Sequence, residues 1–140
     1  MKKIMQGNLE DLAPKHKDWV LGHFMEEGSP FKTKAFELKW DKLKKGEKKS
    51  SLGTQKTAKT LGILVYGKFE FDFPKENLSR ASGKARGKKI ILSKEGDYCF
   101  YDAGVTHSWR ILEDCLLISI RWPSLPGDQV QSGQAPSPTK

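Results

Sequence analysis

Short runs of β-branched and aromatic residues recur along the chain, with turn-forming residues between them. The runs span residues 18–25, 36–41, 60–73, 90–92, 98–101, 108–112 and 115–122. Glycine, aspartate, asparagine or serine occurs in the gaps, and no segment shows a convincing amphipathic-helix pattern. Short strands at this regular spacing predict an all-β domain, built as a sandwich or a barrel.

The clearest alternation lies in the sequence FELKWD, residues 36–41. One face carries Phe36, Leu38 and Trp40, and the other carries Glu37, Lys39 and Asp41. This period of two is typical of a half-buried strand. We expect the apolar face to be buried, and the acids at 37, 70 and 102 to be solvated.

Glycine and acidic residues divide the longer runs. Gly67 and Lys68 interrupt the run 60–73, where Phe69, Phe71 and Phe73 alternate with charged residues, and this pattern predicts a hairpin. A further turn is expected at residues 113–114, between two separate strands.

A length of 140 residues suits one domain with flanking segments. We expect a polar lead-in at 1–17, a single β-barrel domain at 18–124 and a Pro, Gly and Ser-rich tail at 125–140. The tail is predicted to be disordered, although residues 123–130 still hold Leu125 and could pack on the body. Residues 74–88 are polar and predicted to form a long mobile surface loop.

The charge balance favours anionic partners. The chain has 25 Lys and Arg against 17 Asp and Glu, a net charge of +8. Binding of nucleic acid or an acidic protein through residues 42–59 and 84–94 is one alternative, but these segments lack the interleaved Arg and aromatic residues of a base-reading surface. The two cysteines, Cys99 and Cys115, cannot build a disulfide framework. No apolar run approaches the length needed to cross a bilayer, so we expect a cytoplasmic protein with no membrane partner.

One segment resembles a known family. The sequence GDYCFYDAGVTH, residues 96–107, is similar to the second conserved motif of the cupins, with Asp102 where the family has proline. Residues 60–67 resemble the second half of the first cupin motif, which ends at a glycine. The resemblance implies a double-stranded β-helix, or jelly-roll barrel, in which the ring of His107 points into the barrel.

The departures from the cupin pattern concern the metal ligands. Thr60 stands where the family has a glutamate ligand, and the family's HxH pair falls on Thr54 and Lys56, or on Gly53 and Gln55. His107 therefore remains as a single imidazole, and one imidazole cannot hold a divalent ion. His16 is expected on the surface and His23 packed at a strand edge. The sequence predicts no metal and no other cofactor.

These observations predict a metal-free cupin-fold protein that binds a small organic ligand, with anions among the candidates. The predicted ligand-binding residues are Gln55, Tyr66, His107 and Trp109. Some metal-free cupins are isomerases or epimerases, so the resemblance also makes His107 a candidate acid–base catalyst. Two alternatives stay open: a basic interaction protein, and a structural barrel that pairs as a homodimer. The inward residues could also simply fill the barrel as a core.

Overall fold

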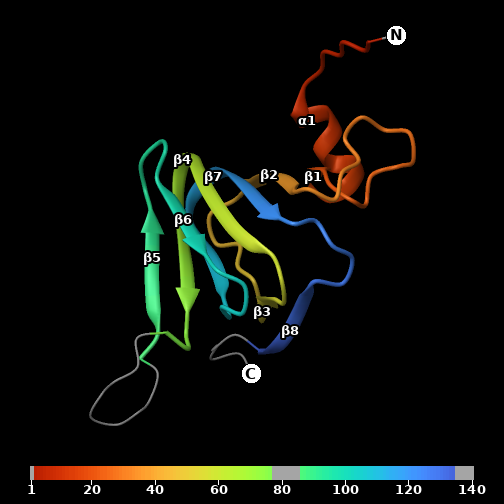
Figure 1. Ribbon diagram of the computed structural model, residues 1–140. Helices are drawn as coiled ribbons and strands as arrows, with labels where there is room; N and C mark the ends of the chain where they lie inside the picture. Colours follow the sequence, from red (N-terminus) through yellow and green to blue (C-terminus); the bar gives the residue numbers. More distant parts are fainter. Residues whose placement is uncertain (1, 77–85, 135–140) are drawn as a thin grey trace.

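The computed structural model describes residues 2–76 and 86–134, and nearly all of its regular structure is β-strand (Figure 1). Most of the predicted surface loop at 74–88 lies outside these residues, as do residues 135–140. The N-terminal segment forms one short α-helix and one 3-10 helix, α1 (Leu9–Leu12) and η1 (Ala13–His16). The strands are β1 (Trp19–Leu21), β2 (Glu37–Leu43), β3 (Ser51–Gln55), β4 (Lys59–Phe73), β5 (Lys88–Leu92), β6 (Tyr98–Tyr101), β7 (Ser108–Trp122) and β8 (Gln129–Gln134). No helix in the described ranges is long and apolar enough to span a membrane.

Six strands form one antiparallel sheet and two form another. The large sheet has the order β1-β2-β7-β4-β5, and β6 pairs with the first part of β4. In the small sheet β3 pairs with β8. A backbone bridge between Gly53 and His107 connects β3 to the start of β7, with both N···O distances at 2.9 Å. The all-β prediction is confirmed.

The two longest strands, β4 and β7, pair with each other along their length, which corrects two predicted turns. Gly67 does not turn a hairpin: it lies in a stretch of shifted register between Leu64 and Phe69, with a φ of +92°. Residues 113–114 likewise lie within a continuous β7. A glycine with positive φ fits a β-bulge as well as a turn, and the long-range pairing with β7 decides between them.

Large apolar side chains fill one part of the interior. Phe69, Phe71 and Phe73 of β4 are buried together, as their alternation predicts, with ring centroids of successive pairs 4.5 and 5.9 Å apart. They pack with the other members of the core: Leu64, Leu92, Cys99, Tyr101, Ile111, Cys115 and Leu117. Both cysteines are buried and free.

Strand β2 has the opposite orientation to the one expected. Glu37 and Asp41 are buried, whereas Leu38 and Trp40 lie on the outer face and are only half buried. Glu70 of β4 is also buried, and its carboxylate accepts a hydrogen bond from Arg110 Nε at 2.7 Å. Asp102 is exposed, in line with the expectation for it. The predicted solvation of Glu37 and Glu70 is therefore wrong, because each has a cationic partner within the fold.

The ordered body extends past the expected start of the tail. Strand β8 covers Gln129–Gln134 and pairs with β3 over residues 51–55. Just before it, Asp128 accepts hydrogen bonds from the backbone N–H groups of Thr57 and Ala58, both at 2.9 Å. Backbone pairing, which does not require apolar side chains, orders a segment whose composition predicted disorder.

Replacing Gly67 tests the bulge. A Cβ at this position would overlap the backbone oxygen of Asp114 and the Cβ of Cys115, whereas a Cβ at Gly96, which also has a positive φ, would meet nothing within 4 Å. Both Gly67→Ala and Gly96→Ala carry a conformational cost of about 1–2 kcal/mol, because an L residue is strained at positive φ. We expect Gly67→Ala to lose about 1–3 kcal/mol more, from overpacking. Urea unfolding measures both, and equal losses would contradict the bulge geometry.

Candidate functional site

A cavity of about 260 Å³ lies inside the barrel, between the large sheet and the segment that leads into β3. One part of its wall is apolar and aromatic, formed by Phe69, Phe71, Trp109 and Leu117. The rest is polar, and it carries three cationic side chains and one carboxylate: Lys39, Lys49, Arg121 and Asp41. An interior of this composition differs from a packed apolar core and has the mixed lining of a small-molecule site.

His107 lies on this wall, directly before β7. Its side chain is 2% exposed, and its ring lies 4.6 Å from the ring of Tyr101, centroid to centroid. Nδ1 is 3.2 Å from the backbone oxygen of Val105. Because a carbonyl oxygen can only accept, Nδ1 carries the proton and Nε2 is an acceptor. Burial, reinforced by the charge of Lys49, lowers the pKa of His107 to about 4.

Lys49 places an ammonium group in the cavity. Its backbone N–H donates to the oxygen of Trp109 at 2.9 Å, and its side chain passes over Gly53, where a Cβ would collide with Nζ. Among the described residues no carboxylate lies within 4 Å of this ammonium. Burial and then the charges of Arg121 and Lys39 lower the pKa of Lys49 to about 8.

The other cations of the cavity have anionic partners. Lys39 Nζ lies 3.0 Å from Asp41 Oδ2. Arg121 lies over the ring of Trp19, 4.9 Å from its centroid, and Arg121 Nη1 is 3.6 Å from Glu37 Oε2. Arg121 Nε is buried and has no hydrogen-bond partner within the described ranges. This N–H is a free donor beside the cavity.

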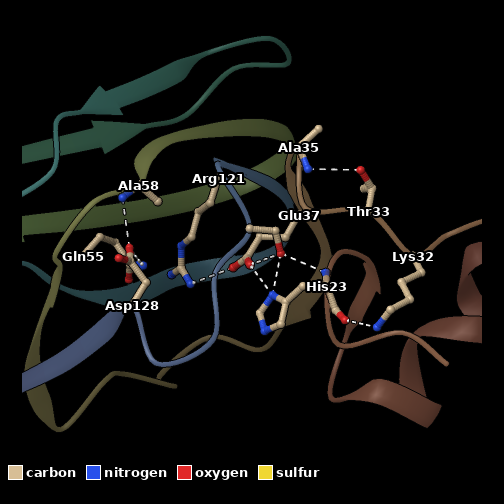
Figure 2. A network of polar contacts seen from close by, with 10 residues as sticks. His23, Lys32, Thr33, Ala35, Glu37, Gln55, Ala58, Arg121 and Asp128 are labelled. Atoms are coloured by element: carbon tan, nitrogen blue, oxygen red, sulfur yellow. Dashed lines mark hydrogen bonds and ion pairs between the residues drawn. The ribbon is translucent and has the colours of Figure 1, made fainter. Parts of the chain in front are cut away.

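A buried polar network holds Glu37 in place behind Arg121 (Figure 2). The hydroxyl of Ser124 donates to Glu37 Oε1 at 2.7 Å. It accepts from the backbone N–H of His23 at 2.9 Å, and His23 Nδ1 lies 2.7 Å from it. Ser124 is fully buried and so fixes the carboxylate that orients the guanidinium. His23 is half buried and packed near Phe24, close to the role predicted for it.

The structure places the four predicted ligand-binding residues in three different surroundings. His107 and Trp109 both line the cavity. Gln55 is buried in an adjoining hollow, where its Nε2 donates to Asp128 Oδ2 at 3.3 Å. The residues that line both this hollow and the cavity are Trp19, Arg121 and Gln129. Tyr66 is 47% exposed on the outside of the barrel. Tyr66 therefore does not face the cavity as a ligand-binding residue would, because the irregular pairing between Leu64 and Lys68 interrupts the alternation of β4.

Sequence reasoning missed Lys49 and Arg121. Residues 42–59 are rich in lysine, and no local signal distinguishes Lys49 from its neighbours. Lys49 is distinguished only by the pairing of residues 46–53 with the first half of β7, which brings Lys49 to the cavity. Arg121 could have been found by parity, since Leu117, Ser119 and Arg121 alternate along β7 and line the cavity together.

The residues around His107 do not fit the metal site of metal-dependent cupins. Thr60, at the position of the glutamate ligand, lines the same cavity with a hydroxyl in place of a carboxylate. The charged groups that act on His107 are the ammonium of Lys49 and the guanidinium of Arg121, and both repel a metal cation. In the described ranges no three His, Cys, Asp or Glu side chains cluster closely enough to share a metal ion.

Comparison with known proteins relates this chain to solved structures only. No protein-family model matches, and no curated protein matches the sequence. Among solved structures, KdgF from Halomonas sp. has 22% identity and a TM-score of 0.52, covering 67% of this chain and 74% of its own. A double-stranded beta-helix protein from Klebsiella pneumoniae has 14% identity and a TM-score of 0.56, covering 78% and 84%.

A third neighbour is much longer than this chain. Oxalate decarboxylase from Bacillus subtilis has 20% identity and a TM-score of 0.54, and the match covers 71% of this chain but 24% of the enzyme. At these identities the likeness concerns the fold alone. Together with the two sheets and the inward His107, it shows that the chain has the double-stranded β-helix fold of the cupins.

Proposed function

We propose that this protein binds a small organic anion, a carboxylate in the first place, in the barrel cavity. The observation that carries the proposal is the ammonium of Lys49, which faces the cavity and has no anionic partner within the described residues. The free N–H of Arg121 Nε lies at the same cavity. A buried cation without a partner is unfavourable, and an anion that accepts charge-assisted hydrogen bonds would relieve it.

The rest of the lining suits the organic part of such a ligand. Trp109, Phe69 and Phe71 offer apolar surface on one side. Thr60 lines the same cavity, and a hydroxyl can both donate to and accept from a ligand. His107 Nε2 is available as an acceptor, for a ligand hydroxyl for example. In this proposal His107 recognises a neutral polar group, while Lys49 and Arg121 bind the anionic group.

Replacing Lys49 tests the anion site. We expect Lys49→Met to weaken binding of a small carboxylate by roughly 10- to 100-fold, the typical effect of losing a hydrogen bond to a charged group. Lys48→Met is the matched control, since it removes the same charge from an exposed neighbour. Isothermal titration with lactate, pyruvate, succinate and inorganic phosphate measures both variants. Equal weakening by the two substitutions, or no binding of any probe by the native protein, would contradict the proposal.

The pH dependence of stability tests the state of His107. Its folded pKa of about 4 lies below the ordinary value of 6.5, so the unfolded chain binds more protons between these values. The free energy of unfolding therefore falls as the pH drops through this window. Between about pH 7 and about pH 4.5 we expect His107 to account for a loss of about 2–3 kcal/mol.

His107→Asn, which can keep an N–H near the oxygen of Val105, should lack this part of the loss. Urea unfolding of the native and variant proteins at both pH values gives the comparison. If the two proteins lose stability equally on acidification, the buried neutral state of His107 is refuted.

A second candidate function, pairing with another copy of this chain, is favoured by the outer face of the large sheet. Two cross-strand rows there consist entirely of apolar and aromatic residues: Leu38, Ile120, Leu61 and Phe100 in one row, and Trp40, Ile118, Ile63 and Tyr98 in the next. Tyr98 and Phe100 are 67% and 45% exposed. We propose that these two rows, the outer apolar face, form the interface of a homodimer.

The net charge of the chain limits where two copies can meet. Two molecules with a net charge of +8 repel each other over most of their surface, and contact is least unfavourable where charged side chains are absent. The rows themselves hold no charged residue and lie on regularly paired strands, which suits a contact between two sheets, and the Glu10–Lys42 ion pair borders them at Trp40.

Introducing a charge into the outer apolar face tests the dimer. We expect the native protein to have the mass of a dimer by light scattering and Ile118→Glu to be monomeric, because the variant would bury an unpaired carboxylate. The control is Ile91→Glu, which changes an exposed isoleucine of β5 that lies outside the two rows. A monomeric native protein, or loss of the dimer in both variants, would contradict the proposed interface.

A further inference from the structure

We propose that Lys49 forms a Schiff base with a small 2-oxo carboxylate held in the barrel cavity. This inference rests on the proposed function, since the cavity must first bind the anion, and it goes further by naming the substrate class and the atom that reacts. The reacting atoms are Nζ of Lys49 and the carbonyl carbon next to the carboxylate of the ligand.

The placement of Lys49 is the first support. Lysine ammonium groups normally lie in water or pair with a carboxylate, and Lys42, Lys44 and Lys68 of this chain all do so. Lys49 instead lies half buried on the wall of the barrel cavity, with no carboxylate within 4 Å among the described residues. The backbone hydrogen bond from Lys49 to Trp109 fixes the position of the residue beside the cavity. The absence of a side chain at Gly53 leaves room for the ammonium group of Lys49. An amine kept apart from any anionic partner is available as a nucleophile.

The neighbouring cations are the second support. Arg121 and Lys39 line the cavity with Lys49 and disfavour its protonation, in addition to the effect of burial. The pKa of about 8 leaves an appreciable fraction of free amine near neutral pH. Desolvation and an adjacent cation are the two arrangements by which lysine is activated toward carbonyl substrates.

The ligand class follows from having both groups in one cavity. In a 2-oxo carboxylate the anionic group is bonded directly to the electrophilic carbon. An anchor for the carboxylate and a reactive amine must therefore act within one small space. Arg121 Nε, a buried donor without a partner in the described ranges, is the anchor, and Lys49 is the amine. The aromatic wall at Trp109 and Phe71 remains for a short apolar side chain of the ligand.

The step is a condensation that needs no oxidant or reductant. The free amine of Lys49 adds to the carbonyl carbon and the carbonyl π electrons move to oxygen, which gives a carbinolamine after proton transfer from nitrogen to oxygen. The nitrogen lone pair then forms the C=N bond as the hydroxyl group leaves as water. In total one ammonium and one ketone give one protonated imine and one water, with the charge unchanged.

Two side chains of the cavity suit the proton transfers. Burial raises the pKa of Tyr101, so its phenol stays protonated and can donate to the carbinolamine oxygen. His107 Nε2 is an unprotonated acceptor that can take a proton from nitrogen transiently and return it to the departing oxygen. Both side chains line the cavity with Lys49.

Reductive trapping tests the inference on the full-length protein. Pyruvate is added, followed by sodium borohydride, and the intact mass and the peptide masses are measured. We expect one adduct with the mass of pyruvate less one oxygen atom, located on Lys49. Lys48→Met should keep the adduct, and Lys49→Met should lack it. An adduct spread over many lysines, or one kept in Lys49→Met, overturns the inference.

A second variant separates this inference from the proposed function. Lys49→Arg keeps a cation for the carboxylate but has no amine that can condense, so it should bind pyruvate and lactate while forming no adduct. If the native protein binds both compounds in titration but gives no trapped adduct, the Schiff base is refuted and the anion site stands. If neither compound binds, both proposals fail.

Discussion

The antiparallel ladder between β4 and β7 is the constraint on which the rest of the structure depends. It joins the two longest strands, carries β2 on one side and β5 and β6 on the other, and ends at His107 beside the barrel cavity. Its register decides which side chains face inward: Thr60 on β4, and Leu117, Ser119 and Arg121 on β7. The intervening residues form the outer apolar face. A shift of one residue would exchange the two sets.

The irregular stretch at Gly67 lets one ladder serve two kinds of interior. On one side of it, Phe69, Phe71 and Phe73 point into an apolar core. On the other side the same strand contributes Thr60 and Gly62, both small, opposite the cavity-lining part of β7. The two interiors adjoin, because Phe69 and Phe71 also line the cavity and the ring of Phe71 packs over Gly62.

The sequence predicted the elements that depend on local patterns. Apolar runs and their alternation located the strands other than β3 and β8, and the glycines of residues 96–107 located the turn before His107. It did not predict features that depend on which strands meet. The residues next to Gly67 in the sequence are compatible with either a turn or a bulge, and only the pairing of β4 with β7 shows that it is a bulge. Lys49 is one lysine in a lysine-rich segment until residues 46–53 are paired with β7. The tail was underestimated because β8 is ordered through backbone hydrogen bonds to β3, which composition does not reveal.

The reversed orientation of β2 is the most informative disagreement. Alternation alone says that a strand has two unlike faces, and hydrophobicity would turn Leu38 and Trp40 inward. The structure turns Glu37, Lys39 and Asp41 inward instead, where each has a partner of opposite charge: Arg121 for Glu37, and Lys39 and Asp41 for each other. Such an arrangement carries a desolvation cost on the inside and exposes apolar surface on the outside. An anion in the barrel cavity would lower the first cost by neutralising the excess positive charge there. A second sheet against the outer apolar face would lower the other cost by covering the apolar rows. The two faces of the same strands therefore argue together for a ligand inside the barrel and a partner outside it.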